Sequence, residues 1–155
     1  MDIMVEFLLV SSSFPLKEVY DTIGIEGETK RIDEAIISTA SNGSYVREKA
    51  CSITYSTGYL KTIDVEEPIK QIISLLHLRE EQIIQCIEKF KLQSRFCIVI
   101  NLTDNPIIQL PQNFIDMASR LHADIEIDSY INYNRKGNVA KSWFNFKKNK
   151  KAVKR

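Results

Sequence analysis

Three carboxylates alternate with apolar residues near the end of the chain, at Asp124, Glu126 and Asp128. In an extended strand they would share one face with Tyr130, with successive members about 7 Å apart. A hard cation needs oxygens that converge to about 2.0–2.6 Å from it, and one strand cannot bring three together. We therefore predict no metal and no cofactor here. The pattern instead indicates either an acidic contact face of these four residues for a basic partner or a strand edge protected by charge.

A second candidate site is the segment 132–155, which holds nine of the 21 basic residues and no acidic residue. The preceding 131 residues carry 12 basic and 20 acidic residues, a net charge of −8. Basic residues interleaved with aromatic residues are typical of single-strand nucleic-acid binders and also suit an anionic membrane surface. The tail could equally be a solvated segment without a packed structure. Its candidate binding residues are Trp143, Lys147 and Lys148.

Since the acidic body would repel nucleic acid, we favour docking of residues 139–146 on the body, with a frayed end after Lys147. Docking of this kind would bring the basic residues of the tail close to the acidic face. The partner we expect first is another protein, and nucleic acid bound through the tail is the alternative. No membrane partner is expected, because no apolar run approaches the length of a membrane span.

Nucleophilic chemistry has weaker support in the sequence. The only histidines are His77 and His122, and the three cysteines, Cys51, Cys86 and Cys97, are widely spaced with no CxxC pair. A thiol in an apolar strand usually behaves as an inert small hydrophobe. An odd number of cysteines suits reduced thiols in the cytoplasm better than a disulfide framework. We predict no catalytic residue, and hence no enzyme.

The elements that must position these residues follow from the hydrophobic periodicity. Segment 64–92 carries two apolar stripes interrupted in the middle, so it forms two helices or one kinked helix. Gly24 is expected to cap the helix that precedes it. We predict strands at residues 4–10, 34–39, 49–56, 95–102, 106–110 and 123–131, and helices at 16–23, within 64–92 and at 111–121.

This order predicts an α+β fold, with a mainly antiparallel sheet of about five strands and helices packed on one face. The length of 155 residues suits one such domain, which we place at 1–131, with 132–155 as a basic, aromatic-containing tail. A run of apolar residues near the start is too short and too acidic for a signal peptide. We expect a cytoplasmic protein.

The chain resembles a bacterial family, the domain of unknown function 4279 (DUF4279). The resemblance rests on the helix that ends in Ile-Gly-Ile at residues 23–25, on Ser-Thr-Gly-Tyr-Leu at 56–60, and most closely on residues 107–131, which close in Asp128-Ser-Tyr130. Departures from the family pattern are Tyr59 in place of a usual Trp and the absence of Pro-Thr after Gly24. The resemblance implies a protein without enzymatic activity. It also implies a role as an immunity protein or as an accessory partner protein. We accordingly expect a non-enzymatic, cytoplasmic protein-binding module.

Overall fold

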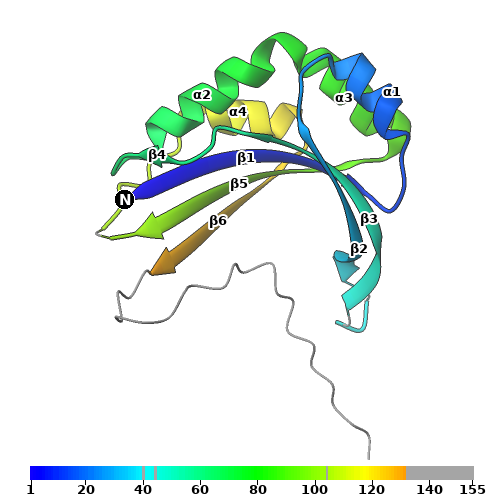
Figure 1. Ribbon diagram of the computed structural model, residues 1–155, viewed down its shortest axis with the longest axis horizontal. Coiled ribbons are helices and arrows are strands. Elements are labelled where there is room, and N and C mark those ends of the chain that lie inside the picture. Colours follow the sequence, from blue (N-terminus) through cyan, green and yellow to red (C-terminus); the bar gives the residue numbers. More distant parts are fainter. Residues whose placement is uncertain (40, 44, 104, 132–155) are drawn as a thin grey trace, which may run out of the picture.

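The computed structural model describes residues 1–39, 41–43, 45–103 and 105–131. Within them, the helices all lie on one face of a single bent sheet (Figure 1). The elements are β1 Asp2–Ser11, α1 Leu16–Ile23, β2 Glu28–Thr39, β3 Tyr45–Ser56, β4 Leu60–Lys61, α2 Glu66–Leu76, the 3-10 turn η1 His77–Arg79, α3 Glu80–Phe90, β5 Gln93–Leu102, α4 Gln112–Arg120 and β6 Asp124–Ile131. The predicted boundary between 131 and 132 stays a prediction.

The first strand lies inside the sheet, whose order is β2-β3-β1-β5-β6. The short β4 pairs with the start of β1, at Asp2 and Ile3, and β3 pairs with the remainder of the same edge. All neighbours are antiparallel except β5 and β6, which are parallel. A parallel pair requires a crossover connection, and α4 provides it. The predicted α+β class and mainly antiparallel sheet are confirmed.

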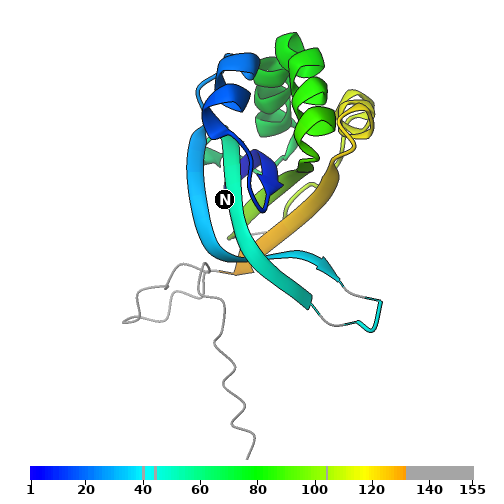
Figure 2. The same ribbon diagram turned by 90° about the vertical axis from the view of Figure 1, so that its right-hand side faces the viewer.

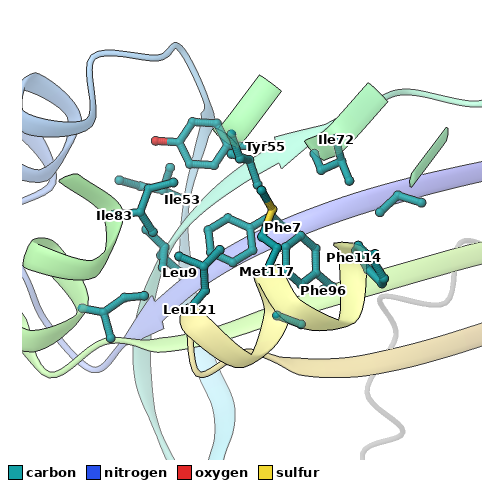
Figure 3. Close-up of a cluster of buried hydrophobic side chains, with 14 of the residues drawn as sticks. Phe7, Leu9, Ile53, Tyr55, Ile72, Ile83, Phe96, Phe114, Met117 and Leu121 are labelled. Carbon is teal, nitrogen blue, oxygen red and sulfur yellow. The ribbon is translucent and has the colours of Figure 1, made fainter. Parts of the chain in front are cut away.

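The core lies between the sheet and the helices, which the side view places on the same side (Figure 2). Alternate residues of β1, namely Ile3, Val5, Phe7 and Leu9, are fully buried there. Phe96 of β5 lies between two aromatic rings, with 4.8 Å between its ring centroid and that of Phe7, and 4.8 Å to that of Phe114 on α4 (Figure 3). This row of rings joins the two central strands to the crossover helix.

Several predicted elements are confirmed, and the ambiguous helical segment is resolved. Helix α1 has the predicted bounds and ends at Gly24, which adopts a left-handed conformation with φ of 70° and donates its N–H to the Tyr20 carbonyl. Segment 64–92 forms two helices, α2 and α3, joined by the 3-10 turn. The Asp64 carboxylate accepts a hydrogen bond of 2.9 Å from the Glu66 N–H and so caps the start of α2.

Two predictions about strands were wrong. Segment 106–110 is not a strand, because Ile107 has only an isolated bridge to Asp64, in which its N–H bonds the Ile63 carbonyl at 2.9 Å. Prolines at 106 and 111 flank this segment and lack the N–H groups that would extend the pairing. Strand β2 starts at residue 28, six residues before its predicted start, because pairing with β3 overrides the polar composition of this stretch.

We predict that Phe96→Ala lowers the free energy of unfolding by about 3–5 kcal/mol, because it removes a fully buried ring and both aromatic contacts. Urea unfolding followed by circular dichroism measures this loss. Leu78→Ala is the control, because Leu78 is 76% exposed, and it should change the value by less than about 0.5 kcal/mol. A loss below about 1 kcal/mol for Phe96→Ala would contradict a central role for this ring.

Candidate functional site: the open face of the sheet

One face of the sheet has no helix over it in the described part of the chain, and we call it the open face (Figure 1). The sheet arches under the helices, so the open face is concave (Figure 1). The strand registers place the following side chains on it: Asp2, Met4, Glu6, Leu8 and Val10 of β1, Arg95, Cys97, Val99 and Asn101 of β5, and Asp124, Glu126, Asp128 and Tyr130 of β6.

Carboxylates from two strands flank the Cys97 thiol at the centre of this face. Glu6 is aligned with Cys97 on one side, and Glu126 is aligned with it on the other. The next row along β6 contributes Asp128, which is aligned with Val99. Because neighbouring strands lie about 4.8 Å apart, these groups form one acidic cluster. We call Glu6, Glu126 and Asp128 the carboxylate cluster.

Two contacts organise the β6 side of the open face. The Arg95 guanidinium donates to a Glu126 carboxylate oxygen at 2.9 Å, with both side chains about half exposed. The Tyr130 hydroxyl donates to Asp128 Oδ2 at 2.5 Å. Asp128 thereby holds the phenol ring along its own strand. The first contact neutralises one carboxylate, while the second leaves the charge of Asp128 in place.

These surroundings keep the thiol and the phenol neutral. Burial, together with the nearby charges of Glu126, Asp128 and Glu6 and against the opposing effect of Arg95, raises the pKa of Cys97 to about 12. The hydrogen bond to Asp128, followed by burial, raises the pKa of Tyr130 to about 12. A thiolate is the nucleophilic form of cysteine, so Cys97 is the opposite of an activated nucleophile.

The four residues predicted as an acidic contact face do share one side of β6. Asp124 and Glu126 are exposed, while Asp128 and Tyr130 are half-buried. The remaining candidates, Trp143, Lys147 and Lys148, lie outside the described residues, as does segment 139–146. Whether any of them binds a partner stays a prediction.

Sequence reasoning missed Glu6, Arg95 and Cys97 as members of the same face. Glu6 is the one charged residue inside the apolar run of β1, and that interruption was the available signal. No pattern along the chain reveals that β1 and β6 both lie next to β5, because strand order depends on long-range pairing.

The other residues considered for chemistry are dispersed. His77 lies in η1 on the helix side of the sheet, with Nδ1 3.0 Å from the Ser74 carbonyl oxygen, so the sheet separates it from Cys97. His122 is exposed in the turn between α4 and β6, with φ of 50°. Burial on α3 raises the pKa of Cys86. Among the described residues, no three His, Cys, Asp or Glu side chains are placed to hold a metal ion.

The fold defines a small α+β domain with helices on one side of its sheet and a charged open face on the other. The sequence profile of the family described as Domain of unknown function (DUF4279) matches residues 1–132. The chain therefore belongs to this family, which confirms the resemblance seen in its sequence. No curated protein and no solved structure matches the chain.

In the described part of the chain, every helix is too short or too polar to cross a lipid bilayer.

We predict that Cys97 reacts with iodoacetamide at pH 8 about 50-fold more slowly in the folded protein than in urea. The rise of the Cys97 pKa from 9.0 to about 12 lowers the fraction of thiolate at pH 8. The thiolate that remains is a stronger nucleophile, but this offsets only part of the loss. Peptide-resolved mass spectrometry measures the rate for each cysteine separately.

In the same assay, Asp128→Asn should increase the Cys97 rate severalfold, because it removes one of the charges that disfavour the thiolate. Asp116→Asn is the control, since Asp116 lies on α4 and bonds Gln112 there. A Cys97 rate equal to that in urea would contradict the described electrostatics of the open face.

Proposed function

We propose that this chain is a non-enzymatic protein-binding module of the bacterial cytoplasm, and that it binds a basic partner protein through the open face. The observation that carries this proposal is the carboxylate cluster, which gathers acidic side chains from β1 and β6 on a face that none of the described helices covers. A sheet face of this kind suits a partner surface with cations at matching positions.

Charge supports a protein partner with a basic surface. Residues 1–131 have a net charge of −8, but segment 132–155 brings the whole chain to +1, so attraction of a basic partner depends on the local charges of the open face. Arg95 forms an ion pair with Glu126, whereas Asp128 accepts a hydrogen bond from the uncharged Tyr130 hydroxyl. Among the described side chains, Asp128 thus contributes a negative charge to the open face.

Contact chemistry supports the same partner class. Tyr130 is half-buried and held by Asp128, so a partner would meet an aromatic ring that is already oriented. Tyrosine is enriched among the residues that dominate binding energy at interfaces. Met4 and Leu8 are half-buried on the same face and add apolar surface beside the carboxylates.

The neutral thiol supports a role without catalysis. Cys97 is the only cysteine on the open face among the described side chains, and its raised pKa disfavours the thiolate needed for attack on a substrate. Within the binding class, we favour an immunity-type protein, whose acidic face would cover a basic surface of a toxin and block it by occlusion.

Charge reversal on β6 tests the proposal. The variant Asp124→Lys with Asp128→Lys should lower the affinity for the partner at least about tenfold, equivalent to about 1.4 kcal/mol, while the fold is kept. Immobilised protein first isolates the partner from a lysate of the source organism, and titration with the purified partner then gives the affinity.

The matched control is Glu81→Lys with Glu88→Lys, which makes the same change in net charge on exposed positions of α3. It should bind as the unmodified protein does. Equal binding by the β6 variant and the unmodified protein would refute the open face as the contact surface.

The alternative function is nucleic-acid association through the tail, which the nine basic residues of segment 132–155 favour. It predicts capture that needs the tail, disappears on nuclease treatment and falls steeply with salt concentration. Capture of one protein that survives both nuclease and removal of the tail would exclude this alternative.

A further inference from the structure

Strand β6 ends the sheet on one side, because β5 pairs with one of its edges and no described strand pairs with the other (Figure 1). Along this free edge, carboxylates on the open face alternate with isoleucines on the helix side. The side chains of Ile127 and Ile131 are 42% and 60% exposed. Edges of this kind recruit other strands unless the protein covers them. The chain continues from Ile131 for 24 residues, and they start at this edge.

We propose that residues 138–147 pair with the free edge of β6 as an additional antiparallel strand. The connection would be the four residues Asn134-Arg135-Lys136-Gly137. Four-residue hairpin loops are most often built around a type I turn, which favours Asn at its first position and Gly at its last. A loop at this place sets Tyr133 opposite Asn138 and thereby fixes the register of every later pair.

In that register the two strands match on the helix side of the sheet. Phe144 lies opposite Ile127, and Phe146 lies opposite Ile125, which is itself partly buried against the core. Both rings would cover apolar surface that β6 exposes as the last described strand at this edge. Cross-strand pairs of aromatic and β-branched residues stabilise antiparallel sheets.

The same register matches charges on the open face. Lys147 lies opposite Asp124, Trp143 lies opposite Asp128, and Lys141 lies opposite Tyr130, which makes it a diagonal neighbour of Asp128. The residue opposite Glu126 is the neutral Asn145, and Glu126 already has Arg95 as its ion-pair partner from β5. A shift of one residue would place the phenylalanines against the carboxylates, so the register is specified by both faces of the strand.

Electrostatics disfavours a second copy of β6 as the occupant of this edge. Antiparallel pairing of two β6 strands about a twofold axis at Glu126, Ile127 or Asp128 sets carboxylates against carboxylates, which is destabilising. The tail, in contrast, brings cations. A short connection also gives the tail an effective concentration in the millimolar range, which favours pairing within one chain.

Backbone amide exchange and tryptophan fluorescence of the full-length chain test the proposal directly. The amides of residues 138–147 should exchange at least about tenfold more slowly than in the unfolded chain, because the strand binds them into the sheet. Trp143 is the only tryptophan, so its quenching by acrylamide reports on the tail alone and should be severalfold weaker than in urea. Exchange of these amides at the unfolded rate would overturn the proposal.

A matched pair of variants locates the docking surface. Ile127→Lys should restore fast exchange in residues 138–147, because it places a cation opposite Phe144. Ile115→Lys should leave exchange unchanged, since Ile115 has the same 42% exposure but lies on α4. Continued slow exchange in β1 and β5 shows that each variant is folded. Equal behaviour of the two variants would overturn β6 as the docking strand.

Engineered cysteines test the register and the occupant. Ile127→Cys with Phe144→Cys should form a disulfide within one chain under mild oxidation, identified by peptide mapping. Ile127→Cys with Asn145→Cys should not, because Asn145 faces the opposite side of the sheet. A preference for the second pair would overturn the register.

Protection of residues 138–147 that falls on dilution would instead mean that a second copy supplies the strand, and would overturn pairing within one chain.

Discussion

Strand β1 has neighbours along both edges, and the rest of the fold depends on this arrangement. One edge pairs with β3 and β4, and the other pairs with β5 over nine residues. Because its side chains alternate, the same strand buries Ile3, Val5, Phe7 and Leu9 under the helices. Any change that displaced β1 would separate both halves of the sheet and remove the support on which the helical layer packs.

The one-sided arrangement of helices decides which residues can have a function. Carboxylates on the helix side of the sheet would carry a large cost of desolvation, so the acidic residues of β1 and β6 occupy the other side. Once there, they add to the effect of burial in raising the pKa of Cys97, and Asp128 orients Tyr130. The open face thus combines carboxylates of β1 and β6 with a neutral thiol, and the proposed binding function rests on this combination.

The edge position of β6 has a separate consequence. A parallel pair with β5 leaves its second edge without a described strand, and the exposed Ile127 and Ile131 show that its apolar side is only partly covered. The alternation of carboxylates and isoleucines along β6 predicts a strand whose two sides differ in polarity. Alternation assigns residues to two faces, but it carries no information on how many neighbours a strand has.

Local patterns determined much of this protein before any tertiary contact. The bounds of α1, the capping Gly24, the capping Asp64 and the common face of Asp124, Glu126 and Asp128 all follow from periods of 3.6 or two and from backbone preferences within a few residues. Tertiary structure alone decided that Glu6 and Arg95 join these carboxylates around Cys97. It also decided that β2 starts at residue 28 and that Ile107 forms a single bridge. Those outcomes depend on which strands pair and in which register, and the free energy of such pairing resides in contacts between residues far apart in the chain.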